Sequence, residues 1–173
     1  MQPVLKPLIT RDQIQARLRE LAADINRDYA GQPLILVGVL KGVFIFLADL
    51  IRLLEMPVRV DFVRLRSYGS GDTSSGQVEI TKDLEIPIRD EHVLIVEDII
   101  DSGLTLQYLL NLLQQRQPRS LKICCLTDKP ERRSLDVPID YVGFQVPRGF
   151  LVGYGLDYAE KYRQLPDICE LEL

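Results

Sequence analysis

The stretch that decides the fold is Val96-Glu97-Asp98-Ile99-Ile100-Asp101-Ser102-Gly103-Leu104-Thr105. It follows a continuous apolar run that begins at His92, and it precedes a segment whose leucines recur at helical spacing. Such a sequence is typical of a strand, a polar loop and a helix in an α/β protein. Three carboxylates therefore stand near the carboxyl end of a predicted buried strand, where open α/β sheets bind their ligands.

The loop has the composition of a sugar-phosphate site. Backbone N–H groups at a helix start, with the hydroxyls of Ser102 and Thr105, suit a phosphate. Gly103 permits the close backbone approach that such a cradle needs. Glu97 and Asp98 can accept hydrogen bonds from the hydroxyls of a sugar beside that phosphate. The alternative is that the acidic residues merely cap the following helix.

Strand and helix patterns alternate along the rest of the chain. We predict helices over residues 10–29, 43–54 and 106–115, and strands over residues 34–40, 58–63, 77–82, 92–96, 121–126 and 141–144. This alternation implies a parallel sheet with helices on both faces. Small and polar residues from Ser67 to Gly76 predict a mobile loop. No linker divides the 173 residues, so we expect one domain.

Composition narrows the class of protein. Hydrophobic residues make up 46% and charged residues 27%, as in a soluble globular domain. The net charge of -4 disfavours a nucleic-acid binder that works by bulk electrostatics. We expect Cys124, Cys125 and Cys169 to be buried thiols in a reducing compartment. No signal peptide is visible and no apolar run is long enough to span a bilayer, so we expect a cytoplasmic protein without membrane contact.

The segment from Val96 to Thr105 resembles the phosphoribosyl-pyrophosphate signature of type I phosphoribosyltransferases, and its sequence is similar to that of the hypoxanthine-guanine branch in its short bacterial form. The resemblance extends to Leu40-Lys41-Gly42, Ser67-Tyr68, Lys129 and the segment from Val142 through Arg163. It implies the type I phosphoribosyltransferase fold. That fold has a parallel central sheet flanked by helices, and a small hood formed by the N-terminal segment and approximately residues 148–173.

For the sugar phosphate, the resemblance implies a ribose and 5′-phosphate site at Glu97, Asp98, Asp101, Ser102, Gly103, Leu104 and Thr105. It makes Asp101 the general base near purine N7. The chemistry supports this role, because a 6-oxopurine loses its imidazole proton as N9 attacks the sugar. Asp101 could instead cap the helix or position the loop. Leu104 stands where many relatives carry lysine or arginine, so one phosphate contact is absent.

For the leaving group, the resemblance implies that Leu40, Lys41 and Gly42 form a pyrophosphate loop, with a cis peptide bond before Lys41. Arg163 would meet the same pyrophosphate. The implied cofactor is Mg2+, held near Glu97, Asp98 and Asp157 with few protein ligands. The residues alone leave Lys41 equally open to being a solvated charge at the end of a strand.

For the base, the resemblance implies that Lys129 donates to the exocyclic O6, which discriminates against amino purines. It makes Phe150 the stacking aromatic and Leu151 a backbone contact to the base edge. Ser67 and Tyr68 would form the tip of a loop that closes over the site. From composition alone, Phe150 could belong to the core and the loop could be an ordinary hairpin tip.

The resemblance thus implies transfer of a 5-phosphoribosyl group from 5-phospho-α-D-ribose 1-diphosphate to hypoxanthine or guanine, in a homodimer or homotetramer. Pro147-Arg148-Gly149 departs from the pattern of some relatives, which leaves the choice among 6-oxopurines open. Two other functions remain as alternatives. One is a different base, xanthine or a pyrimidine. The other is a transcriptional regulator that keeps the fold, which would need a basic surface that the net charge does not indicate.

Overall fold

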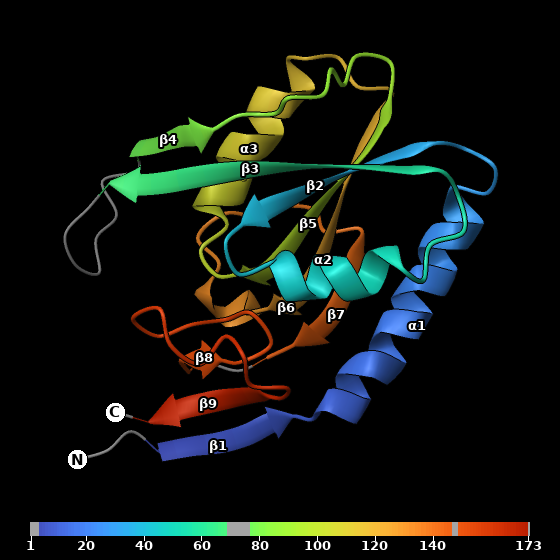
Figure 1. Ribbon diagram of the computed structural model, residues 1–173. Helices are drawn as coiled ribbons and strands as arrows, with labels where there is room; N and C mark the ends of the chain where they lie inside the picture. The colour runs from blue at the N-terminus through green and yellow to red at the C-terminus, as the bar shows by residue number, and fades with distance from the viewer. Residues whose placement is uncertain (1–3, 69–76, 147–148, 173) are drawn as a thin grey trace.

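A six-stranded sheet forms the centre of the computed structural model, which describes residues 4–68, 77–146 and 149–172 (Figure 1). Its strand order is β4-β3-β2-β5-β6-β7. The strands are β2 (Leu34–Leu40), β3 (Val58–Tyr68), β4 (Gln77–Lys82), β5 (His92–Ile100), β6 (Ser120–Asp128) and β7 (Tyr141–Gln145). All neighbours are parallel except β3 and β4, which form an antiparallel edge. The predicted parallel sheet is confirmed.

Helices cover both faces of this sheet. On one face, α1 (Arg11–Asp28) and α2 (Phe44–Ile51) pack against alternate residues of β2, such as Leu34 and Leu36. On the other face, α3 (Leu104–Gln114) packs against the residues between them, Ile35 and Val37. Because successive side chains of a strand point to opposite faces, a strand buried on both sides must be apolar throughout. This is why the central strands read as continuous apolar runs.

The first helix begins as the sequence predicts. The Thr10 hydroxyl accepts a hydrogen bond from the backbone N–H of Gln13, whose side chain accepts one from the N–H of Thr10. This capping box satisfies two N–H groups that lack partners inside the helix. Ile14, Leu18 and Ile25 then lie on one buried stripe. The predicted helix from Thr10 is therefore confirmed.

A second, three-stranded sheet joins the two ends of the chain (Figure 1). Its order is β1 (Val4–Ile9), β9 (Ile168–Glu172) and β8 (Leu151–Val152), all antiparallel. The apolar pattern did not predict these strands, for two physical reasons. β1 is exposed over most of its length, and β8 has only two residues. Such strands are stabilised by their partners rather than by burial of their own apolar face.

Several predicted boundaries are wrong because strand pairing carries the sheet further than the apolar pattern shows. β5 was predicted to end at Val96, but it pairs with β6 as far as Ile100. β3 was predicted to end at Val63, but it pairs with β4 through Ser67 and Tyr68. Those two residues therefore lie in a strand and not in the predicted loop.

The rest of that loop, residues 69–76, lies outside the described residues. α2 is shorter than predicted, and α3 begins two residues earlier.

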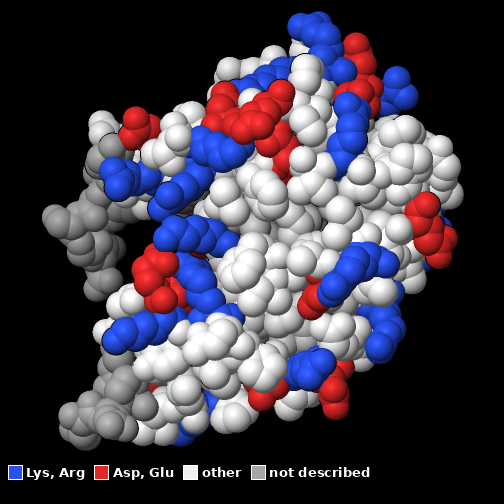
Figure 2. Space-filling view, viewed as in Figure 1, with Lys and Arg blue, Asp and Glu red and all other residues white. Residues whose placement is uncertain are grey.

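The surface and the thiols agree with the composition. Positive and negative side chains are interspersed over the face in Figure 2. Within the described residues, no helix is both long and apolar enough to cross a membrane. Cys124, Cys125 and Cys169 are buried and free, as predicted.

Candidate functional site

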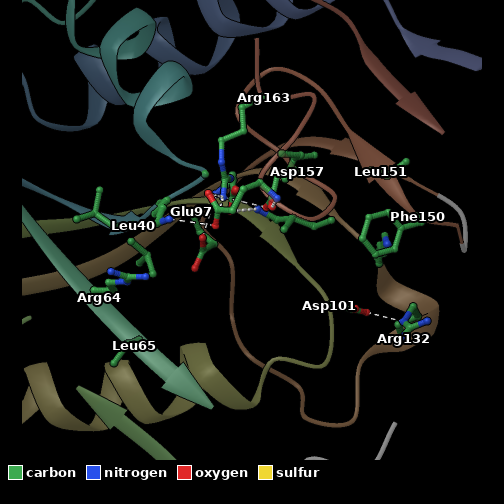
Figure 3. Close-up of a pocket in the computed structure, with 18 of the residues that line it drawn as sticks. Leu40, Arg64, Leu65, Glu97, Asp101, Arg132, Phe150, Leu151, Asp157 and Arg163 are labelled. Carbon is green, nitrogen blue, oxygen red and sulfur yellow. Dashed lines mark hydrogen bonds and ion pairs between the residues drawn. The ribbon is translucent and has the colours of Figure 1, made fainter. Parts of the chain in front are cut away.

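A cavity of about 840 Å³ opens at the carboxyl ends of the central strands (Figure 3). It brings together every leaving-group and base residue that the sequence predicts, and also the predicted acids. These are Leu40, Lys41, Gly42, Glu97, Asp98, Asp101, Lys129, Phe150, Leu151, Asp157 and Arg163. In Figure 3, Arg163 reaches toward Glu97, while Phe150 and Asp101 lie together on the other side. The chain thus folds distant segments around one space.

A smaller cavity of about 230 Å³ adjoins the start of α3, and Ser102, Gly103 and Thr105 line it. Gly103 is the N-cap of the helix, with a φ of 85° that favours glycine. The N-cap residue offers no capping side chain, the Ser102 hydroxyl accepts the N–H of Leu104 at 3.4 Å, and Asp101 accepts a hydrogen bond from Arg132, so the alternative that Asp101 serves as the cap is wrong. Because the first N–H groups of a helix lack internal partners, they can bind an anion in this cavity. Leu104 is not among the lining residues.

Glu97 and Asp98 form a tightly coupled acidic pair at the end of β5. The backbone of Asp98 is fixed on both sides, since its N–H donates to Glu97 at 3.2 Å and its carbonyl accepts the Thr127 hydroxyl at 2.8 Å. Burial, followed by the charge of Asp98, raises the pKa of Glu97 well above its usual value. Burial also raises the pKa of Asp98. Two carboxylates in this state favour a cation or hydroxyl donors beside them.

Gly42 sits where the acidic pair meets the C-terminal segment. A Cβ at this position would lie 1.8 Å from Oδ2 of Asp98 and 3.3 Å from the carbonyl oxygen of Gly155. A Cβ on Gly155 would in turn lie 2.1 Å from the carbonyl oxygen of Gly42. Only glycine permits this approach of the two backbones. The peptide bond between Leu40 and Lys41 is cis, as predicted.

Asp101 is the first residue after β5, and its Oδ1 accepts a hydrogen bond from Nε of Arg132 at 2.6 Å. Arg132 belongs to the short helix η1 (Pro130–Arg132) after β6. The next residue, Arg133, anchors this segment through a buried ion pair with Asp128 at 2.8 Å. The acidic loop and the segment that follows β6 are therefore held together by charge.

Lys129 and Phe150 present complementary groups to the cavity. The Lys129 side chain is only 5% exposed, and Nζ donates to the carbonyl oxygen of Gly149 at 2.6 Å. Burial lowers the pKa of Lys129. Phe150 is 46% exposed and contacts Tyr158 edge-on, so the alternative that it belongs to the core is wrong. A buried ammonium beside an exposed aromatic face suits a flat polar ring. Phe144, by contrast, packs against the core.

The two cations that were predicted to meet the pyrophosphate are paired with two carboxylates in one turn of the chain. Nη2 of Arg163 lies 3.0 Å from Oδ1 of Asp157 and 3.4 Å from Glu160. Nζ of Lys41 lies 3.0 Å from Oε1 of Glu160. The backbone N–H of Glu160 donates to Asp157 at 2.8 Å, which fixes the turn. Lys41 is thus engaged in the site, which argues against a merely solvated charge.

A divalent cation would find few ligands from the protein alone. Over residues 4–68, 77–146 and 149–172, no three His, Cys, Asp or Glu side chains are grouped so as to hold a metal. Glu97 and Asp98 are adjacent, but Asp157 is engaged by Arg163 and by a backbone N–H. The acidic pair fits a cation that takes most of its ligands from a bound substrate.

Sequence reasoning missed Arg64, Arg132 and Glu160, all of which line the cavity. Arg64 lies in the part of β3 that the strand prediction omitted. Arg132 and Glu160 are charged residues on turns, and such residues are usually solvated. The sequence does contain one indication of Glu160: it is an acidic residue three positions before Arg163, which was predicted to belong to the site.

Comparison with known proteins matches the chain to the phosphoribosyl transferase domain family over residues 10–159. The chain is 47% identical over 175 residues to hypoxanthine phosphoribosyltransferase of Salmonella typhimurium, which covers 100% of this chain and 98% of that protein. A solved hypoxanthine-guanine phosphoribosyltransferase from Bacillus anthracis superposes with a TM-score of 0.92 at 44% identity, over 99% of this chain and 100% of that one. A hypoxanthine phosphoribosyl transferase of Trypanosoma cruzi, solved to study the role of its C-terminal region in oligomeric state and enzymatic activity, gives a TM-score of 0.91 at 46% identity, over 96% of this chain and 91% of that one.

Proposed function

The chain belongs to the phosphoribosyl transferase domain family, and from this premise we propose that it transfers a 5-phosphoribosyl group to hypoxanthine or guanine. The donor is 5-phospho-α-D-ribose 1-diphosphate, and the products are IMP or GMP and pyrophosphate, as in purine salvage. One observation carries the proposal: buried Lys129 and exposed Phe150 share a cavity with the acidic loop. A base site and a sugar-phosphate site therefore adjoin.

The sugar phosphate would lie along the acidic loop. Glu97 and Asp98 accept hydrogen bonds from the ribose hydroxyls, which stabilise both carboxylates in their charged form. Ser102, Gly103 and Thr105 hold the 5′-phosphate at the start of α3.

The base would lie between Phe150 and the two charged groups beside it. Lys129 has two N–H donors beyond the one bound to Gly149, and one of them donates to O6 of the purine. An amino purine would present a donor to this donor, which disfavours adenine. Asp101 takes the imidazole proton as N9 attacks, and Arg132 holds its carboxylate in place. Leu151 contributes a backbone contact to the base edge.

The pyrophosphate would leave toward Lys41, Gly42 and Arg163, and the charges of Lys41 and Arg163 would stabilise the developing negative charge. Mg2+ bound near Glu97 and Asp98, with Asp157 beyond, would neutralise the diphosphate and orient it. We propose that Ser67 and Tyr68, at the end of β3, act as a lid over the site that excludes water.

We also propose that the whole chain acts as one domain in the cytoplasm, with the three-stranded sheet as a hood beside the cavity. We propose a homodimer or homotetramer. The study of the Trypanosoma cruzi relative links its C-terminal region to oligomeric state, and the C-terminal strand of this chain lies in the hood.

An absorbance assay with hypoxanthine, guanine, xanthine, adenine and uracil tests the proposal, with Mg2+ and 5-phospho-α-D-ribose 1-diphosphate present. We expect turnover of hypoxanthine or guanine and none of adenine or uracil. Turnover of xanthine or uracil alone would change the assigned base. No turnover of any base would refute the proposed enzymatic activity.

A further inference from the structure

We propose that Glu160 is an internal counter-ion. In the ligand-free site its carboxylate pairs with the cations that would bind pyrophosphate, and a diphosphate must displace it in order to bind. This inference deepens the proposed function and rests on it for the identity of the ligand. Glu160 faces both cations assigned to the leaving group, with Lys41 at 3.0 Å and Arg163 at 3.4 Å. A carboxylate between two cations mimics an anionic ligand.

The exposed fractions of the two side chains indicate which carboxylate, that of Glu160 or that of Asp157, a bound diphosphate displaces. The side chain of Glu160 is 64% exposed, while that of Asp157 is 29% exposed and that of Arg163 is 18% exposed. Asp157 also accepts the backbone N–H of Glu160, so its removal would undo the turn. Within the described residues, the Glu160 side chain is held by Lys41 and Arg163 and by no backbone N–H, so it can swing into water. Asp157 therefore stays with Arg163, and Glu160 releases Lys41.

The backbone holds Glu160 in this position. Ala159, Glu160 and Tyr162 have φ values of 50°, 62° and 78°, and Tyr158 pairs with Lys161 in an isolated bridge. Residues with side chains rarely adopt this conformation, so the turn presents the carboxylate at some conformational cost. Hydrogen bonds from Lys41 first, and then from Arg163, lower the pKa of Glu160. The carboxylate is therefore charged at neutral pH and competes with a bound anion.

The displacement of Glu160 predicts the direction in which the affinity for pyrophosphate changes when its charge is removed. A diphosphate must separate Glu160 from its cations and then approach a displaced negative charge. Removal of that charge therefore tightens binding. An exposed ion pair is a modest interaction, so we expect inorganic pyrophosphate to bind Glu160→Gln about threefold to tenfold more tightly than the unaltered chain. The Michaelis constant for 5-phospho-α-D-ribose 1-diphosphate should fall in parallel, while turnover should not rise, since pyrophosphate leaves more slowly.

The experiment is calorimetric titration of the full chain with inorganic pyrophosphate, with and without Mg2+, at low salt and at 0.5 M KCl. The difference between Glu160→Gln and the unaltered chain should shrink at high salt, because screening weakens exposed charges. Glu20→Gln is the matched control. Glu20 is 65% exposed and pairs with Arg17 at 2.5 Å on α1, away from the cavity, so its substitution should change neither constant.

Unchanged or weaker pyrophosphate binding by Glu160→Gln would overturn the proposal. Weaker binding only in the presence of Mg2+ would identify Glu160 as a metal ligand instead. Thermal unfolding of each variant checks that the turn is intact, and Glu160→Ala repeats the test without a side-chain amide. Tighter pyrophosphate binding in a chain that transfers no phosphoribosyl group would support this inference while refuting the proposed function.

Discussion

Two sides of the cavity are built in different ways. The acidic side comes from one contiguous motif, residues 97–105, at the end of β5 and the start of α3. The opposite side is assembled from residues 40–42, from Lys129 and from residues 149–163. On the acidic side, Glu97 and Asp98 have raised pKa values, whereas on the assembled side Lys41 and Arg163 are already paired with Asp157 and Glu160. A ligand would therefore stabilise the charged form of the acidic pair, while the two cations must release an internal partner before they can bind one.

The contact between the two sides gives the largest expected effect. In Gly42→Ala, the added Cβ would fall 1.8 Å from Asp98, and the backbone of Gly155 closes the other direction. We expect activity to be nearly abolished and the free energy of unfolding to fall by about 3 kcal/mol, because the buried carboxylate of Asp98 must be displaced. Enzyme assay and chemical denaturation check this. Gly31→Ala is the control for loss of a glycine: its φ of 71° makes a side chain strained, which costs about 1–2 kcal/mol, but its Cβ meets nothing within 4 Å, so activity should be unchanged. Full activity in Gly42→Ala would show that the two sides do not depend on this approach.

Asp101→Asn tests whether the acidic side does chemistry or only binds. If Asp101 accepts the base proton, turnover should fall by a factor of about 10² to 10⁴. The affinity for 5-phospho-α-D-ribose 1-diphosphate should stay nearly unchanged. Steady-state kinetics and equilibrium binding separate the two quantities. Arg132→Gln breaks the ion pair but keeps the carboxylate, so it should have the smaller effect. Equal losses of turnover and binding in Asp101→Asn would instead indicate a loop-positioning role.

Lys129→Ala probes the assembled side at the base. Loss of a charged donor to O6 should raise the Michaelis constant for the base by a factor of about 10 to 100. The constant for the sugar diphosphate should change far less. Lys122→Ala is the control, because Lys122 lies in β6, the strand that Lys129 directly follows, but outside the cavity. If the constant for the sugar diphosphate rose more than that for the base, the placement of Lys129 would be refuted.

The smallest expected effect concerns stability. Because burial and the charge of Asp98 raise the pKa of Glu97, the folded chain binds more protons than the unfolded chain from about pH 4 up to the folded pKa. This pair therefore lowers stability as pH rises through the folded pKa. Glu97→Gln should raise the free energy of unfolding by about 1–2 kcal/mol at pH 8, or ~2–8 °C in Tm, and by less at pH 5. Thermal unfolding at both pH values measures the difference. A gain that is equal at pH 5 and pH 8 would contradict the linkage.

The sequence predicted the acidic side well because its residues are neighbours in the chain. A strand, a loop with Gly103 and a helix start place residues of the segment from Glu97 to Thr105 along the two cavities through local geometry. The assembled side was predicted at Lys41, Lys129 and Arg163 only through resemblance to a family. No local pattern distinguishes these charges from solvated ones.

The sequence by itself determined the α/β class, the capped start of α1 and the ligand-binding end of the sheet. These depend on side-chain period and on local hydrogen bonds, which act between residues close in sequence. Only the tertiary structure decided the extensions of β3 and β5 and the sheet that joins the chain ends. It also decided the pairing of Lys41 and Arg163 with Glu160. Each of these depends on a partner far along the chain, whose position is set by packing rather than by the residues beside it.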